Sequence, residues 1–104
     1  MNFGLSDETI GKFQMVFARF PEIESVVIYG SRAKGTFREG SDIDITLIGK
    51  NVTEEIRSKV WLDIDDLNTP YLIDLSVFHH LKSEDLTDHI QRVGKVFYQN
   101  NSSR

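Results

Sequence analysis

The sequence predicts an α/β (α+β) domain in which helices flank a small mixed β-sheet. Three short apolar segments have the character of strands, at Ser25–Tyr29, Asp42–Ile48 and Tyr71–Phe78. Segments with apolar residues at helical spacing precede, separate and follow these strands. This alternation of the two kinds of element predicts a sheet covered by helices.

Length and composition predict one cytoplasmic domain. The chain has 104 residues, 39% of them hydrophobic, and we expect a single domain over residues 1–98 with a polar, flexible tail over residues 99–104. The absence of cysteine excludes disulfides and thiolate metal sites. No apolar run is long enough to span a membrane, and the first residues lack a secretion signal, so we expect no membrane association.

The charge limits the kind of partner. A formal net charge of −4 argues against autonomous nucleic-acid binding, which needs a basic surface. It does not exclude a nucleotide substrate, because bound metal ions reverse the local field.

The first helix has clear boundaries in the sequence. Ser6 or Asp7 is a suitable N-cap. Apolar residues then recur at helical spacing from Ile10 to Phe20, and Pro21 ends the pattern.

The centre of the chain is predicted to contain two strands joined by a basic turn. Strand Ser25–Tyr29 leads into a short helical turn over Ser31–Thr36, and a loop over Phe37–Gly40 connects to strand Asp42–Ile48. Apolar and polar residues alternate along the second of these strands, so one face is expected to be buried and the other polar.

The last third is predicted to be helix, strand and helix. Thr53 is a suitable cap for a helix whose apolar stripe extends to Leu67, and Asn68–Pro70 break it before strand Tyr71–Phe78. A last helix is expected from Ser83. The apolar residues expected on its inner face are Leu86, Ile90, Val93 and Phe97.

The most informative segment is residues 28–44, IYGSRAKGTFREGSDID. Gly30 has no Cβ, so backbone can approach a ligand there, and Ser31 with the following N–H groups can contact phosphate oxygens. Asp42 and Asp44 are two residues apart on a strand, so their carboxylates share a face with Cα atoms roughly 6.5 Å apart. This spacing suits two carboxylates that share divalent ions.

Asp74 is a candidate third carboxylate. It interrupts the apolar strand Tyr71–Phe78 and points away from its apolar face. From its spacing alone, a solvated carboxylate explains Asp74 equally well.

The segment resembles the signature of the DNA polymerase β-like nucleotidyltransferase superfamily, which is Gly-Ser, a spacer and Asp-x-Asp. It is most similar to that of the minimal nucleotidyltransferases (MNT) of prokaryotes, Gly-Ser-Arg-Ala-x-Gly, a spacer and Ser-Asp-Ile-Asp. The matching residues are Gly30, Ser31, Arg32, Ala33, Gly35, Ser41, Asp42, Ile43 and Asp44.

The resemblance implies the polymerase β-like nucleotidyltransferase fold and a site for two Mg²⁺ ions, with Mn²⁺ as an alternative. Asp42, Asp44 and Asp74 would be the catalytic residues and metal ligands. The nucleotide-binding residues that it implies are Gly30, Ser31, Arg32 and Ser41.

Several side chains keep two interpretations at this point. Arg32 could hold the triphosphate or brace its loop, and Ser41 could cap a turn or contact phosphate. For His79, His80 and His89 we expect structural or solvent-exposed roles.

The activity implied by the resemblance is transfer of a nucleoside monophosphate, AMP from ATP or the equivalent from another NTP, to a hydroxyl of a partner protein. In the MNT family that partner is a HEPN-domain protein, often a toxin, and the MNT protein is its antitoxin. The alternatives are a non-catalytic inhibitory subunit of a two-protein complex and nucleotidyl transfer to a small molecule. The complete carboxylate set favours an enzyme.

Overall fold

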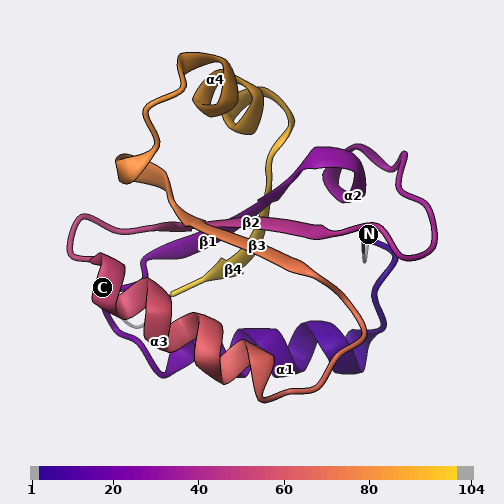
Figure 1. Cartoon of the computed structure of the whole chain (residues 1–104), viewed down its shortest axis with the longest axis horizontal. Helices are drawn as coiled ribbons and strands as arrows, with labels where there is room; N and C mark the ends of the chain where they lie inside the picture. Colours follow the sequence, from indigo (N-terminus) through magenta and orange to yellow (C-terminus); the bar gives the residue numbers. More distant parts are fainter. Residues whose placement is uncertain (1–2, 101–104) are drawn as a thin grey trace.

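The fold is a four-stranded mixed sheet with helices on both faces (Figure 1). It is taken from a computed structural model, which describes residues 3–100. The strand order is β3-β2-β1-β4, with β2 antiparallel to β1 and parallel to β3, and β4 antiparallel to β1. The strands are β1 (Ser25–Tyr29), β2 (Ile43–Ile48), β3 (Ile73–Val77) and β4 (Lys95–Gln99).

The helices separate the two faces of the sheet. Figure 1 shows α1 and α3 side by side along one face, and α2 and α4 on the other. The helices are α1 (Asp7–Ala18), α2 (Gly30–Lys34), α3 (Glu54–Asp65) and α4 (Glu84–Val93), with a 3₁₀ turn η1 (Phe78–His80) after β3. This arrangement confirms the predicted small mixed sheet flanked by helices.

The hydrophobic core lies between the sheet and the pair α1 and α3. Along β2, Ile43, Ile45 and Leu47 are fully buried on this side. Phe13 and Phe17 of α1 face them, together with apolar residues of α3. The predicted alternation along β2 is confirmed, and it leaves the polar residues of the strand on the opposite face.

Local signals in the sequence set the helix ends. The Ser6 hydroxyl accepts a hydrogen bond from the Thr9 N–H at 3.1 Å, so Ser6 rather than Asp7 is the cap of α1. The Thr53 hydroxyl accepts from the Ile56 N–H at 3.2 Å at the start of α3. Both caps satisfy N–H groups that have no partner within their helix.

The predicted last helix is wrong in its second half. Helix α4 ends at Val93, and Lys95–Gln99 is β4, an edge strand paired with β1. Phe97 is buried as predicted, but it is buried from this strand. A helix continuing through Phe97 would leave β1 at the edge of the sheet with unpaired backbone groups, and β4 satisfies them.

An irregularity in β4 explains why the strand does not alternate. Val26 pairs with Tyr98 whereas Val27 pairs with Val96, so Phe97 is an extra residue, as in a β-bulge. The rings of Phe97 and Tyr98 consequently both pack near Phe17, with centroids 6.2 Å and 5.6 Å from its ring.

The polar C-terminal segment is only partly described. Gln99 belongs to β4, and the Asn100 N–H donates to the Glu24 carbonyl at 2.9 Å, so the ordered fold extends into the predicted tail. Residues 101–104 lie outside the described residues, and the division into a domain and a tail stays a prediction. Between residues 3 and 100, no helix combines the length and apolar character that crossing a membrane requires.

Candidate active site

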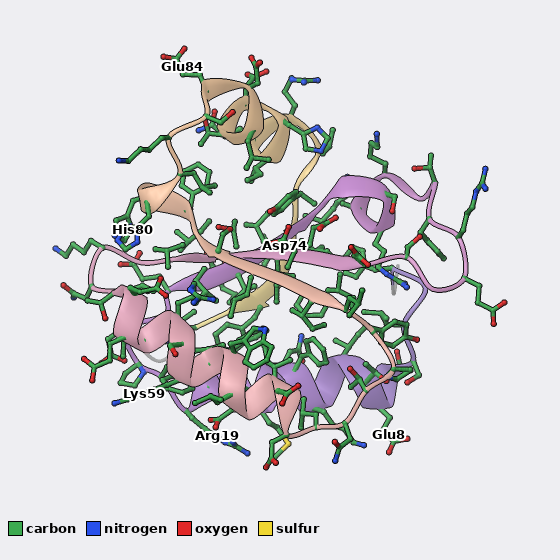
Figure 2. The ribbon with its side chains drawn as sticks, in the orientation of Figure 1. Glu8, Arg19, Lys59, Asp74, His80 and Glu84 are labelled. Atoms are coloured by element: carbon green, nitrogen blue, oxygen red, sulfur yellow. The ribbon has the colours of Figure 1, made fainter. Side chains whose placement is uncertain are left out.

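Two of the predicted carboxylates lie on neighbouring strands, on the sheet face opposite α1 and α3. In the parallel ladder Asp44 is the register partner of Asp74, which Figure 2 labels on β3. Since neighbouring strands lie about 4.8 Å apart, the two carboxylates are side by side. Asp42 precedes β2, is exposed, and acts electrostatically on Asp44.

The negative charges crowd one another. Burial raises the pKa of the half-buried Asp44 carboxyl, and the charges of Asp74 and then Asp42 raise it further, whereas His89 opposes them. Burial also raises the pKa of the Tyr29 hydroxyl, with smaller contributions from Asp74 and Asp44. The site therefore concentrates negative charge that a bound cation would neutralise.

Gly30 stands directly against this cluster. It follows β1, begins α2, and has a φ of +73°. A Cβ added to Gly30 would lie 2.5 Å from Oδ2 of Asp44. Glycine is thus required by the Asp44 carboxylate itself, in addition to any approach of phosphate that the sequence predicts.

Arg32 braces the loop. Its side chain is 2% exposed. Its Nε and Nη2 both donate to the Ser41 carbonyl, at 3.2 and 2.9 Å, and Nη1 donates to the Phe3 carbonyl at 2.9 Å. The guanidinium carbon also lies 5.3 Å from the ring centre of Phe37 and 4.9 Å from that of Tyr71. The structure thus shows the bracing contacts of Arg32, and its contact with the triphosphate stays a prediction.

Ser41 caps the turn that leads to Asp42. Its hydroxyl accepts from the Arg38 N–H at 2.8 Å, and its own N–H donates to the Arg38 carbonyl at 2.9 Å. Arg32 also donates to the Ser41 carbonyl, so Ser41 is fixed on both sides and helps to position Asp42, the next residue.

A row of hydroxyl groups continues from the carboxylates along the same face. The Ser76 hydroxyl donates to that of Thr46 at 2.9 Å, and Thr46 is fully buried. The Ser76 side chain also acts on the Tyr29 hydroxyl, lowering its pKa against the larger effect of burial. The alternation along β2 and β3 places Thr46 and Ser76 on the carboxylate face, and this alternation is the signal in the sequence that could have identified them.

His89 reaches this site from α4. Its ring meets that of Tyr29 edge-on, with centroids 6.3 Å apart and planes at 82°. No signal in the sequence could place it there, because its position depends on how α4 packs against β1.

The other two histidines lie elsewhere. His79 and His80 belong to η1, and their rings are 4.5 Å apart. The 3₁₀ turn brings neighbouring side chains closer than a strand would. His79 also lines a hollow with Glu24 and Lys50 beyond Ile48, the last residue of β2.

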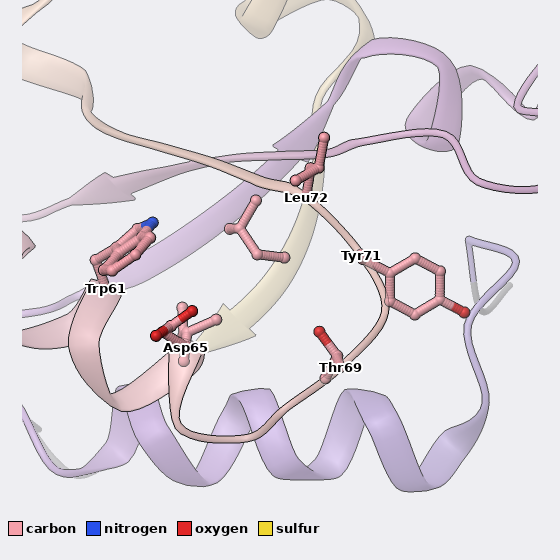
Figure 3. Close-up of a pocket in the computed structure, with 7 residues that line it drawn as sticks. Trp61, Asp65, Thr69, Tyr71 and Leu72 are labelled. Atoms are coloured by element: carbon pink, nitrogen blue, oxygen red, sulfur yellow. The ribbon is translucent and has the colours of Figure 1, made fainter.

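A cavity of about 150 Å³ lies between α3 and the segment entering β3 (Figure 3). Its lining includes Trp61, Thr69, Tyr71 and Leu72, and none of the predicted site residues. The chemistry indicated by the carboxylates is therefore not located there.

The donor set suits a hard cation, but the metal site is not assembled in advance. Carboxylate oxygens are the ligands that Mg²⁺ prefers, and the mutual repulsion at Asp44 favours a cation there. Across residues 3–100, however, no three or more His, Asp or Glu side chains converge closely enough to hold a metal ion. Phosphate and water oxygens would have to complete the coordination, as is common for Mg²⁺.

Carboxylates on adjacent strands beside a Gly-Ser turn define the class of nucleotidyltransferases with this fold. The sequence model of the family "Polymerase beta, Nucleotidyltransferase" matches residues 11–103, and the chain belongs to this family. The comparison with curated proteins found no match.

Solved structures with this fold include antitoxins in complexes. A toxin–antitoxin structure with AMP-PNP is similar with a TM-score of 0.68 and 20% identity, over 93% of this chain and 76% of that one. A Shewanella oneidensis complex of a tri-AMPylated HEPN toxin with its MNT antitoxin has a TM-score of 0.64 and 16% identity, over 92% and 74% of the two chains. The expected likeness to MNT proteins is confirmed at the level of fold.

Proposed function

We propose that this protein is a metal-dependent nucleotidyltransferase that transfers AMP from ATP to a hydroxyl of a HEPN-domain partner, as an MNT-type antitoxin. The observation that carries the proposal is the pairing of Asp44 with Asp74 beside Gly30. The described relatives add support, because one is an MNT antitoxin bound to an AMPylated HEPN toxin.

The residues of the chain have distinct roles in this reaction. Gly30 and Ser31 contact the triphosphate, and Asp42, Asp44 and Asp74 would hold the divalent cation. The acceptor oxygen attacks the α-phosphorus, the bond to pyrophosphate breaks, and Asp74 accepts the proton of the hydroxyl. When bound, Mg²⁺ would supply neutralisation of the charge that builds on the attacking and leaving oxygens.

Arg32 and Ser41 act indirectly in this proposal. Their hydrogen bonds fix the loop between α2 and β2. They thereby set the position of Asp42 relative to Gly30, and precise positioning of this kind contributes strongly to catalysis.

The alternative is an inhibitory subunit that covers its partner without chemistry. The observation in its favour is that residues 3–100 contain no ready-made cluster of three metal ligands. Transfer to a small molecule is the third function class, and mass spectrometry of the acceptor distinguishes it.

The test compares AMP transfer and binding in the same complex. The protein is incubated with labelled ATP, Mg²⁺ and the HEPN-domain partner, and the partner is analysed by mass spectrometry and by pull-down. Asp44→Asn should lower transfer by roughly a thousandfold or more, because a negative ligand is lost, while binding is retained. Asp65→Asn, which changes an exposed carboxylate on α3, is the control.

Each outcome decides between the candidates. Transfer by Asp44→Asn at the wild-type rate would show that the carboxylate mechanism is wrong. Full suppression of the partner by a variant that binds but does not transfer would favour the inhibitory subunit.

A further inference from the structure

The structure does not present the Arg32 side chain to a bound triphosphate. The sequence assigned Arg32 to the triphosphate as one of two interpretations, but the guanidinium is buried against two backbone carbonyls and two aromatic rings. A site that binds a triphosphate beside three carboxylates gains from a side-chain donor facing the phosphates.

His89 occupies the appropriate place. Its ring contacts Tyr29, which immediately precedes Gly30 and is the register partner of Asp44. Its charge acts on the Asp44 carboxyl. His89 therefore lies on the carboxylate face, next to the turn expected to contact phosphate.

The imidazole is available to a ligand. His89 is half-buried, so its ring is held but not enclosed. Among the residues that the structure describes, no hydrogen bond engages either ring nitrogen of His89. A half-buried imidazole with a free N–H is a donor without an internal partner.

Helix α4 holds the ring in position from both ends. The Ser83 hydroxyl caps its start by accepting from the Leu86 N–H at 3.2 Å. At its other end a Cβ on Gly94 would lie 2.5 Å from Cγ1 of Val27, so the chain leaves α4 tightly against β1. Helix α4 also packs against α2, which begins at Gly30.

We propose that His89 is a ligand of the nucleotide triphosphate, donating an imidazole N–H to a phosphate oxygen opposite the Gly30-Ser31 turn. This inference rests on the proposed function, since it requires nucleotide at that turn. A phosphate fits better than a base, because His89 contacts Tyr29, which immediately precedes the expected phosphate turn.

Nuclear magnetic resonance of the wild-type protein tests the contact directly. The ring nitrogen signals of His79, His80 and His89 are followed as an ATP analogue that cannot be cleaved is added with Mg²⁺. The His89 signal should shift with nucleotide, and those of His79 and His80 should stay constant. The backbone amide signals of Gly30 and Ser31 report whether nucleotide occupies the turn.

These signals separate two kinds of failure. Shifts at Gly30 and Ser31 with an unmoved His89 would overturn the inference alone. Constant signals at all of these residues would overturn the proposed function and this inference with it.

Two substitutions distinguish a ligand from a packing residue. His89→Phe keeps an aromatic edge against Tyr29 but has no donor, and should weaken the analogue about tenfold by calorimetry, the size of one hydrogen bond to a charged group. His89→Gln keeps an N–H donor and should recover most of that loss. His80→Phe is the matched control and should bind like the wild type.

The packing explanation predicts the opposite order. If His89→Phe binds within about twofold of wild type while His89→Gln is weak, the ring serves packing and the inference is wrong. Thermal melts of each variant show that the fold is intact, and the wild-type resonance experiment decides independently of the variants.

Discussion

The two faces of the sheet have different roles, since one face packs into the hydrophobic core and the other carries the candidate active site. Toward α1 and α3, β2 presents Ile43, Ile45 and Leu47, all fully buried in a continuous core. Toward α2 and α4, the same strand presents Asp44 and Thr46, which meet carboxylates and hydroxyls of the neighbouring strands. Successive residues of one strand thus serve stability and chemistry in turn.

The comparison shows that the chemical face is maintained at some expense of stability. Burying apolar side chains stabilises the fold by about 25 cal/mol for each Å² removed from water. Burial of the Asp44 carboxylate, together with the nearby charges of Asp74 and Asp42, has the reverse effect and raises the pKa of Asp44. Substitutions of side chains on the two faces should therefore differ in their effect on the free energy of unfolding.

The largest expected effect is on the apolar face. Phe17 is fully buried and packs near Phe13, Phe97 and Tyr98. Phe17→Ala should lower the free energy of unfolding by about 3–5 kcal/mol, since it removes buried area and leaves a cavity. Denaturant titration measures the change.

The matched substitution lies on the other face. Asp74 is exposed, and Asp74→Ala should change the free energy of unfolding by less than about 0.5 kcal/mol. Equal losses from Phe17→Ala and Asp74→Ala would contradict the division between the faces.

Gly30 provides the next test, because it borders the acidic cluster. Gly30→Ala should cost about 1–3 kcal/mol of stability through its positive φ, and should also displace the Asp44 carboxylate and abolish nucleotide binding. Gly35→Ala is the control, since Gly35 has a φ of +82° but nothing within 4 Å of its Cβ position. Calorimetry of nucleotide binding should separate the two, and loss of binding in both would mean that strain alone is responsible.

A smaller effect is expected at Arg32. Arg32→Lys removes the paired donation to the Ser41 carbonyl and the flat contact with two rings, and should cost about 1–3 kcal/mol of stability. Lys34→Ala, an exposed position on the same helix, should stay within about 0.5 kcal/mol of wild type. A stable Arg32→Lys protein that has lost only nucleotide affinity would show that Arg32 is a ligand after all.

The smallest effect concerns pH. The Asp44 pKa is raised above its ordinary value of 3.8 by burial, Asp74 and Asp42, so the folded state holds that proton more tightly than the unfolded state. Stability of the metal-free protein should therefore fall as pH rises through the interval between the unfolded and the folded pKa. Asp44→Asn should melt a few degrees above wild type at neutral pH, given about 4–8 °C per kcal/mol for a domain of this size.

The sign of this difference is the informative part. The advantage of Asp44→Asn should shrink as pH falls toward the unfolded pKa, where the wild-type carboxyl is protonated in both states. Thermal melts across that range measure it. An advantage that does not change with pH would show that charge crowding at Asp44 is not its cause.

The fold was predictable from sequence where local signals agree with the tertiary packing. Residues close together in the sequence predict three features of the fold: the bounds of β1, the caps at Ser6 and Thr53, and the alternation along β2. Strand β4 was not predictable in this way, because the spacing of four residues between Val93 and Phe97 is also typical of the apolar face of a helix. The bulge at Phe97 also removes the alternation that would mark a strand.

Part of the candidate site was likewise predictable from sequence, and part was not. Gly30, Asp42 and Asp44 lie in one segment, and the parallel register brings Asp74 beside them as the resemblance implied. The position of His89 could not be predicted, since it depends on contacts between elements distant in sequence. The burial of Arg32 depends on Phe3 and Tyr71, which are far from it in the chain.

Calorimetric titration of Mg²⁺ with and without ATP analogue tests the central claim, that the acidic face holds a cation together with nucleotide. The account predicts that the wild type binds Mg²⁺ more tightly when the analogue is present, because phosphate oxygens complete the ligand set. The double variant Asp42→Ala/Asp44→Ala should fold and lose this binding. Equal Mg²⁺ and nucleotide binding by the wild type and the double variant would contradict the account.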